Sequence, residues 1–303
     1  MQEVGRRRLL AGAVLGLVLV SLVVAAVFGL RGGAPGRPAY GDAVGVVRIE
    51  GVILGGEGGG LLGGALGADG IVEQLRAAAD DPSIRAVVLR LNSPGGSAAA
   101  SQEIGAEVDR LRRTGKKVVA SMGDTAASGA YWIAAKADRI VANPATITGS
   151  IGVIIQTQHL VGLYQKLGIA TETIKSGPHK DMGAPDRLLT PEERRIFQSM
   201  VDDIYNQFVT VVARGRKMDA AKVRQLADGR VFTGNQAREL GLVDELGDFR
   251  DAVRLAGRLA GIKGEPRVVE LGPKNLWRDL FGGLQNTAVP GAWLLLWPPL
   301  AQR

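Results

Sequence analysis

Serine and lysine are the residues best suited to chemistry in this sequence, because the common alternatives are scarce. The 303 residues include no cysteine and only two histidines, His159 and His179. This composition excludes thiol nucleophiles and thiolate metal sites, and it leaves little for a zinc site or a histidine-based triad. A serine activated by a lysine needs neither residue type. We therefore expect no metal or other cofactor.

Ser128 lies within a run of small residues, DTAASGAY, at positions 124–131. At the first turn of a predicted helix, its hydroxyl would lie near unpaired backbone N–H groups, which favour the negative charge of a deprotonating serine. The small neighbours leave space for a substrate backbone. On local features alone, however, an ordinary helix N-cap is the commoner explanation of such a serine.

Gly95 and Gly96 follow directly after a predicted buried strand, in the sequence SPGG at positions 93–96. Without Cβ atoms, two glycines can turn their N–H groups toward one point, as the oxyanion of a tetrahedral intermediate requires. A tight turn after a strand is the simpler alternative. A nucleotide-binding loop is excluded because no Gly-Lys-Ser/Thr sequence follows.

Lys180 is the candidate general base, in a polar loop predicted for residues 175–190. A lysine serves as a general base when burial lowers its pKa from about 10.4 toward 7 to 8. Ser150, in the sequence TGSIG, could orient the amine by a hydrogen bond. A solvated surface lysine is the ordinary alternative. His179 in the same loop is a rival base, whereas His159 falls inside an apparent helix.

The elements that must position these residues alternate strands with amphipathic helices, which is typical of β/α units on a mostly parallel sheet. Strands are predicted at residues 46–53, 86–91, 117–122, 151–155, 170–174 and 242–243. Helices are predicted at residues 71–79, around 104–111, and at 128–135, 191–214 and 248–259, with a short helix that ends at Gly241. The glycine-rich residues 55–70 are expected to form a loop.

The N-terminal region predicts a membrane anchor. Residues 9–30 carry no charge and follow Arg6, Arg7 and Arg8. This apolar stretch is long enough to cross a bilayer, and the arginines favour a cytoplasmic N-terminus with the remaining chain outside. A cleaved signal peptide is the alternative, but the apolar stretch is too long and lacks a clear A-x-A site.

The excess of 37 Lys and Arg over 30 Asp and Glu is modest. The few aromatic residues are not interleaved with lysines, so the sequence does not indicate nucleic-acid binding. Near the C-terminus, residues 289–300 are apolar but too short and proline-rich to span a bilayer. They either pack as a surface patch or dock in the molecule's own cleft.

Taken together, these motifs resemble the signal peptide peptidase A family. The resemblance covers roughly residues 43–264 and rests on SPGG at 93–96, ASGAY at 127–131, TGSIG at 148–152, SGPHKD at 176–181 and residues 229–246. It implies that Ser128 is the nucleophile, Lys180 the base, Ser150 a hydrogen-bond partner of the lysine, and Gly95 part of the oxyanion hole. The sequence departs slightly from the family at Ala130 and Trp132, which affects the expected pocket shape.

The resemblance also implies an α/β fold of stacked ββα units, like Clp protease and crotonase. The N-terminal transmembrane helix expected from residues 9–30 precedes it. We expect four segments: a cytoplasmic stub and anchor at residues 1–30, a linker at 31–42, a peptidase domain at 43–272 and a C-terminal tail at 273–303. The length resembles the short form of the family, which assembles as a homo-oligomer. Ser128 and Lys180 are therefore expected to meet across a subunit boundary.

The function expected from the resemblance is that of a membrane-anchored serine endopeptidase that degrades remnant signal peptides, which are apolar, at the extracytoplasmic membrane face. A related peptidase that cleaves a stomatin-like partner is an alternative with the same dyad. A crotonase-like binder of acyl thioesters, without a serine nucleophile, and a scaffold that only holds peptides are alternatives from other classes.

Overall fold

The long third strand organises the sheet, because it pairs with different neighbours along its length. In the computed structural model, which describes residues 42–56 and 67–272, β3 (Lys117–Ala127) is parallel to β2 (Ile84–Ser93) on one side. On its other side, the first half of β3 pairs with β4 (Arg139–Ala142) and its last residues pair with β5 (Ile147–Gly149). The end of β3 therefore lies between β2 and β5.

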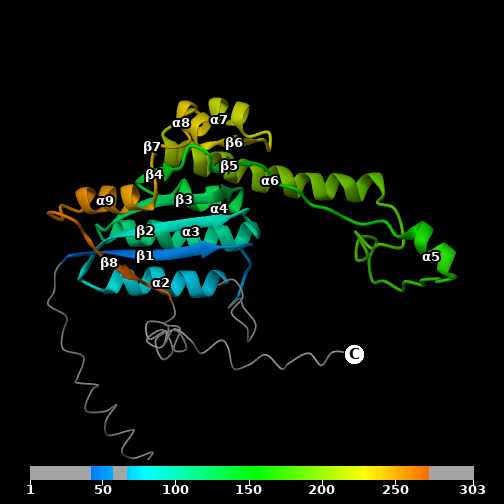
Figure 1. Ribbon diagram of the computed structural model, residues 1–303. Coiled ribbons are helices and arrows are strands. Elements are labelled where there is room, and N and C mark those ends of the chain that lie inside the picture. Colours follow the sequence, from blue (N-terminus) through cyan, green and yellow to red (C-terminus); the bar gives the residue numbers. More distant parts are fainter. Residues whose placement is uncertain (1–41, 57–66, 273–303) are drawn as a thin grey trace, which may run out of the picture. The chain divides into compact units, whose positions relative to one another are not determined.

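The remaining strands extend this sheet at both edges (Figure 1). On the side of β2, the sheet continues through β1 (Ala43–Glu50) to β8 (Arg267–Glu270), both parallel to their neighbours. On the other side, β4 pairs in parallel with β7 (Glu245–Leu246). The exception is β6 (Val231–Thr233), which is antiparallel to β5. A parallel-dominated α/β sheet is thus confirmed, and the strand order is β6-β5-β3-β2-β1-β8.

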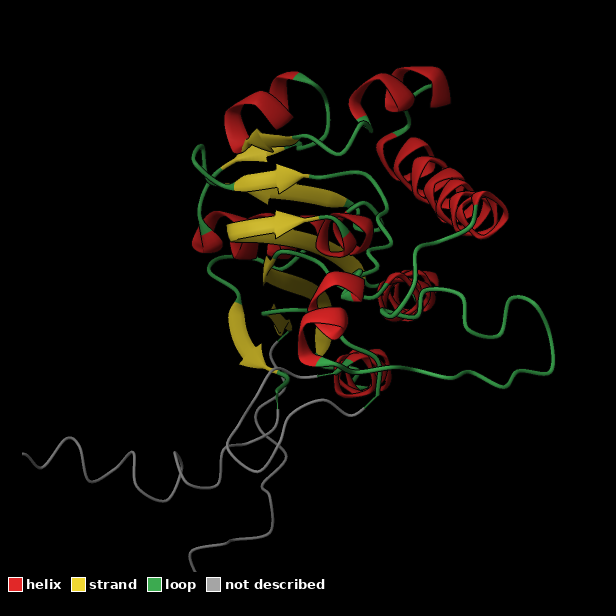
Figure 2. Cartoon of the chain, turned by 90° about the vertical axis from the view of Figure 1, so that its right-hand side faces the viewer, coloured by secondary structure: helices red, strands yellow, loops and turns green. Residues whose placement is uncertain are grey.

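Helices cover both faces of the sheet, because its strands are apolar on both sides. One face packs against α2 (Ala68–Asp80), α3 (Ala98–Arg113) and α4 (Gly129–Ala134), and the other packs against α9 (Phe249–Leu259). The α9 side is a smaller core, in which Val44, Val88 and Val119 meet Ala252 and Ala256. Figure 2 shows the sheet between these helices.

The segment after β5 leaves the sheet. It contains α5 (Val161–Leu167) and a loop that reaches α6 (Pro191–Arg216), and Figure 1 shows α5 and the start of α6 away from the strands. We call residues 152–192 the arm. None of its residues is buried, whereas Phe208, Val209 and Val212 in the second half of α6 are buried in the main core. The chain then continues through α7 (Ala220–Leu226) and α8 (Gly234–Glu239).

Most predicted elements are confirmed with shifted ends, and three predicted strands are wrong. Residues 151–155 and 170–174 form no strand, and the strand predicted at 242–243 lies at Glu245–Leu246 instead. His159 precedes α5 rather than lying inside a helix. The long helix is confirmed: it begins at Pro191 after a capping box formed by Thr190 and Glu193.

The membrane anchor predicted at residues 9–30 lies outside the described residues, as do the tail at 273–303 and most of the glycine-rich loop. Within residues 42–56 and 67–272, no helix combines the length and the hydropathy needed to cross a membrane.

Tyr131 ties α4 to the segment after α8, so its hydroxyl should contribute measurably to stability. The side chain is fully buried, and its hydroxyl donates a hydrogen bond of 2.9 Å to the carbonyl oxygen of Leu242. Burial raises the pKa of this hydroxyl, which keeps it protonated as a donor. We expect Tyr131→Phe to lower the free energy of unfolding by about 1–3 kcal/mol, because the Leu242 carbonyl loses its partner.

Urea denaturation would measure this change as a lower midpoint at an unchanged slope. Tyr164→Phe on α5, where the ring is only half-buried, is the matched control and should leave the midpoint unchanged. An equal midpoint for Tyr131→Phe and the parent chain would contradict the prediction.

Candidate active site

Ser128 lies at a sharp corner between β3 and α4, with a backbone conformation unusual for a serine. Its φ is 53° and its ψ is −121°. A positive φ in a residue other than glycine costs about 1–3 kcal/mol and persists where the surrounding structure holds it. Here the Ser128 N–H donates to the carbonyl oxygen of Gly149 on β5 over 2.9 Å, and its own carbonyl accepts from the Trp132 N–H over 2.9 Å.

The ordinary N-cap explanation of Ser128 is wrong. Its side chain makes no capping hydrogen bond to α4, and its backbone angles differ from the extended ones of a typical N-cap. The hydroxyl is therefore not engaged by the helix that it precedes.

Gly95 packs directly against this corner. A Cβ atom at Gly95 would lie 2.7 Å from the backbone nitrogen of Gly129 and 2.8 Å from Cβ of Ser128. Its φ of 99° is also unfavourable for other residues. The segment is held by Ile53, whose N–H donates to the Gly95 carbonyl over 2.9 Å and whose carbonyl accepts from the Ser97 N–H over 2.8 Å. Glycine is required here by close approach as well as by backbone conformation.

Two backbone N–H groups beside Ser128, those of Gly96 and Gly129, are candidates for binding an oxyanion, because the other two nearby already have partners. The N–H of Gly95 already donates to the hydroxyl oxygen of Ser93 over 3.0 Å, and the N–H of Ser128 donates to Gly149. By contrast, Gly96 and Gly129 both line the cavity at Ser128, and a Cβ at Gly129 would lie 3.4 Å from the Gly96 nitrogen. Gly129, at the start of α4, was expected from the sequence only to leave space for a substrate backbone, not to be an N–H donor.

Ser150 reaches the same cavity from β5. Like Ser128, it follows directly after the end of its strand and has a positive φ, here 50°. Its N–H donates to the carbonyl oxygen of Arg230 over 2.8 Å, which fixes the backbone. Ser128, Ser150 and Gly96 thus come together at the carboxyl ends of three strands, where ligands commonly bind in parallel sheets.

The cavity around Ser128 has a volume of about 770 Å³ and a largely apolar wall. That wall includes Trp132, Ile155, Tyr205 and Phe208, and the rings of Trp132 and Phe208 are 4.9 Å apart at their centroids. Residues 201, 205 and 208 on α6 have helical spacing toward one side, a pattern in the sequence that could have identified them. The cavity is large enough for several side chains of an apolar ligand.

Two carboxylates, Asp202 and Asp228, also line the cavity. Asp228 accepts two hydrogen bonds of 2.8 Å from Nε of Arg230, and this guanidinium lowers the pKa of Asp228 to about 2. Asp228 is therefore ionised but balanced by a cation. Within the part of the chain that the structure describes, no group of histidine, cysteine, aspartate or glutamate side chains is arranged to hold a metal ion.

Lys180 does not line this cavity in the described chain. It is exposed in the loop of the arm between α5 and α6. There its backbone N–H donates to the Gly177 carbonyl over 3.3 Å. His179, the rival base, is 3.7 Å from Glu192 through its Nε2 atom and also belongs to the arm. A single copy of the chain therefore brings together Ser128, Ser150, Gly95 and Gly96, but not Lys180.

Comparison with known proteins identifies a peptidase family. The model of peptidase family S49 matches residues 110–263, about half of the chain. A Synechocystis protein named as a protease is 49% identical over 202 residues, which cover 65% of this chain and 72% of that protein. An Enterococcus faecium protein named as a signal peptide peptidase SppA is 44% identical over 180 residues, 59% of this chain and 52% of that protein.

A longer relative shows the same similarity over only part of its length. Protease 4 of Salmonella typhi is 40% identical over 223 residues, which are 74% of this chain but 35% of that protein. The match to the family model and the identity to relatives named as proteases lead to the same conclusion: this chain is a peptidase that belongs to family S49, and specifically to the signal peptide peptidase A group within it.

Proposed function

We propose that this peptidase is a serine endopeptidase in which Ser128 is the nucleophile and Lys180 the general base. The observation that carries the proposal is the strained corner at Ser128, which lines an apolar cavity together with the backbone of Gly96 and Gly129. A serine hydroxyl free of capping, beside two backbone N–H groups, suits acyl transfer. The crotonase-like and scaffold alternatives give no role to the positive φ of Ser128.

In the proposed reaction, Oγ of Ser128 attacks the carbonyl carbon of the scissile bond while the neutral amine of Lys180 takes the hydroxyl proton. The N–H groups of Gly96 and Gly129 donate to the resulting oxyanion. The protonated amine then gives its proton to the leaving nitrogen, and the peptide bond breaks. Lys180 next deprotonates a water that hydrolyses the acyl ester, and the proton returns to Oγ of Ser128. Ser150 orients the Lys180 amine.

Because Lys180 lies on the arm, we propose that it reaches the Ser128 of a second copy in a homo-oligomer. The arm supports this proposal in two ways. None of its residues is buried within the single chain, and it exposes large apolar side chains, with Ile154 80%, Leu167 62% and Ile174 95% exposed. Exposed apolar side chains gathered on one segment are typical of a protein interface.

The proposed substrates are apolar peptides, and remnant signal peptides in particular. The apolar wall at Trp132, Tyr205 and Phe208 supports this class, as does the Enterococcus faecium relative that carries a signal peptide peptidase name. As part of the same proposal, residues 43–272 form a Clp-like and crotonase-like peptidase domain between a linker at 31–42 and a tail at 273–303. An experimental structure whose β1, β2 and β3 did not superpose on those folds would contradict it.

Fluorophosphonate labelling tests the nucleophile. We expect the probe to label Ser128, because only an activated serine reacts with it. Ser128→Ala should lose the label and at least about 10³-fold of the activity on a synthetic signal peptide. Ser199→Ala on α6, outside the cavity, is the control and should keep both. Label on another serine, or full activity of Ser128→Ala, would refute the proposal. A higher rate on a stomatin-type C-terminal peptide would favour the alternative peptidase.

Mixing inactive chains tests whether sites are shared. Ser128→Ala and Lys180→Ala should each be inactive alone, and co-assembly should restore activity because one copy supplies the serine and the other the lysine. We expect recovery of about one quarter of the parent activity if copies mix randomly. An inactive mixture of correctly assembled chains would show that both residues act within one copy.

Membrane extraction tests the proposed anchor at residues 9–30, which the charge-free apolar sequence supports. The full chain should stay with the membrane after alkaline carbonate treatment, whereas a chain lacking residues 1–41 should be released. An externally added protease should cut the folded part only from the extracytoplasmic side. Release of the full chain by carbonate would exclude an integral anchor.

A further inference from the structure

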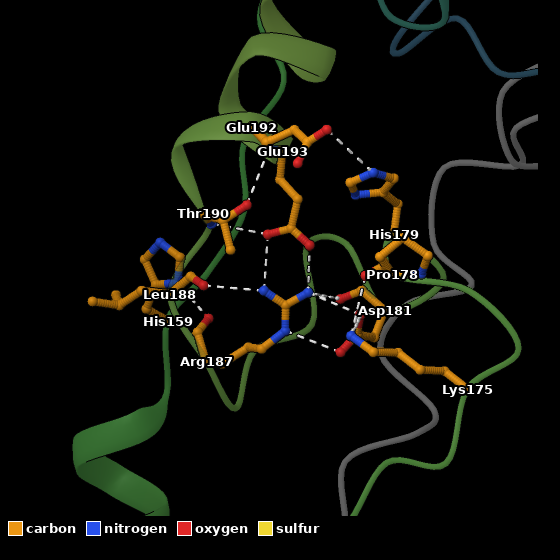
Figure 3. Close-up of polar contacts among 10 residues, drawn as sticks. All are labelled: His159, Lys175, Pro178, His179, Asp181, Arg187, Leu188, Thr190, Glu192 and Glu193. Carbon is orange, nitrogen blue, oxygen red and sulfur yellow. Dashed lines mark hydrogen bonds and ion pairs between the residues drawn. The ribbon is translucent and has the colours of Figure 1, made fainter.

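Arg187 sits between two carboxylates at the base of the loop that carries Lys180 (Figure 3). Its Nε donates to Asp181 Oδ2 over 3.0 Å and its Nη2 donates to Asp181 Oδ1 over 2.9 Å. On the other side, Nη1 donates to Glu193 Oε2 over 2.8 Å and Nη2 to Glu193 Oε1 over 2.5 Å. Both carboxylates are therefore bound by two hydrogen bonds each, the strongest geometry available to an arginine.

Burial and charge make this arrangement more than a surface ion pair. The Glu193 side chain is only 2% exposed and that of Asp181 12% exposed. The Arg187 hydrogen bonds lower the pKa of Glu193 to about 2 and also lower that of Asp181, so both are ionised. Lys175 adds a second cation, 2.6 Å from Asp181 Oδ1, which balances the two negative charges.

The contacts close the loop at both ends. Arg187 Nη2 donates to the backbone carbonyl of Asp181 over 3.2 Å, and Lys175 Nζ donates to the carbonyl of Pro178 over 3.1 Å. Glu193 lies in the first turn of α6 and also accepts from the Thr190 N–H over 2.9 Å. Arg187 thereby links Asp181, the residue after Lys180, to Glu193 at the start of α6.

This polar cluster is the main constraint on the loop, because the arm has no apolar core. None of residues 152–192 is buried, so apolar packing holds the loop only weakly. Both neighbours of Lys180 are engaged, His179 with Glu192 and Asp181 with Arg187. Within residues 175–193, as the structure describes them, Lys180 forms no ion pair, so its amine is left available.

We propose that Arg187 is the positioning residue for Lys180: by joining Asp181 to Glu193, it fixes the direction in which the loop presents the Lys180 amine to the Ser128 of a second copy. This inference rests on the proposed function, in which Lys180 is the base. It assigns no contact between Arg187 and the substrate. Arg187 acts through Asp181, one residue from the amine.

The shared site allows a test that separates positioning from folding. In a mixture of Ser128→Ala and Lys180→Ala chains, only the Ser128→Ala chain supplies Lys180. Arg187→Gln placed in that chain should lower kcat of the mixture by about 10²-fold, because the amine is misplaced. The same change in the Lys180→Ala chain should alter kcat by less than about twofold, since that loop supplies no base, and KM should be unchanged in both arms.

An equal loss in both arms, or a loss in neither, would overturn the inference. Arg254→Gln is the matched control, because Arg254 also lies between two acids, 2.9 Å from Glu265 and 3.8 Å from Asp251, but on α9. It should leave both arms unchanged.

Arg187→Gln leaves the buried carboxylate of Glu193 without its cation, which could prevent folding, so a second variant removes that charge as well. Arg187→Gln combined with Glu193→Gln removes that charge, and glutamine at this position can keep the capping hydrogen bond to Thr190. We expect the double variant to match the thermal midpoint of the parent chain and still lose about 10²-fold in kcat in the Lys180-supplying arm. Parent-like kcat from this variant would refute the positioning role.

Two outcomes separate this inference from the proposed function. If Lys180→Ala alone keeps its activity, Lys180 is not the base and both proposals fail. If Lys180→Ala is inactive but the mixture is not restored, the site is not shared, and Arg187→Gln is then tested in the otherwise intact chain. In that chain, the positioning role predicts a lower kcat at constant KM, together with faster amide hydrogen exchange confined to residues 177–184. Unchanged exchange refutes the positioning role.

Discussion

The hydrogen bond from the Ser128 N–H to the Gly149 carbonyl joins the ends of β3 and β5, and the geometry of the site depends on it. It holds Ser128 at a positive φ, which a serine would not adopt unconstrained. The constraint also brings Ser150, the residue after Gly149, to the cavity. Because β2 is parallel to β3 on the other side, the SPGG segment reaches the same edge of the sheet.

The close packing of Gly95 on Ser128 follows from this constraint. The corner at Ser128 must turn within one residue from a strand into a helix, so its Cβ and the Gly129 nitrogen face the turn after β2. No side chain fits between them. Gly96 and Gly129 are limited by other neighbours: a Cβ at Gly96 would lie 2.1 Å from the Ile53 carbonyl oxygen, and one at Gly129 would lie 2.3 Å from Oγ of Ser101. Close packing thus requires glycine at each of these positions, and both residues line the cavity as candidate N–H donors.

The core was predictable from the sequence because its strands are short runs rich in apolar residues, such as AVVLRL at 86–91 and KVVASM at 117–122. The ends of parallel strands meet at one edge, so the proximity of Ser128, Gly95 and Gly96 was predictable too. The strand at Ile147–Gly149 was missed because three residues give no periodic pattern. Residues 151–155 were predicted as a strand for their apolar side chains, but they do not join the sheet: Ile151 is buried in the core and residues 152–155 line the cavity.

The position of Lys180, which does not line the cavity of its own chain, could not be predicted from local sequence, because a polar loop has no periodic pattern that fixes its direction. What the sequence could have shown is the spacing of Asp181, Arg187 and Glu193, which follow one another at intervals of six residues. An arginine midway between two acids across a loop and a helix start favours closure of that loop. The proposed nucleophile is thus held by sheet pairing and steric packing, whereas its proposed base is held by charge. The two halves of the site therefore depend on different forces, and acid should release the second only as the pH falls toward the lowered pKa of Glu193, about 2.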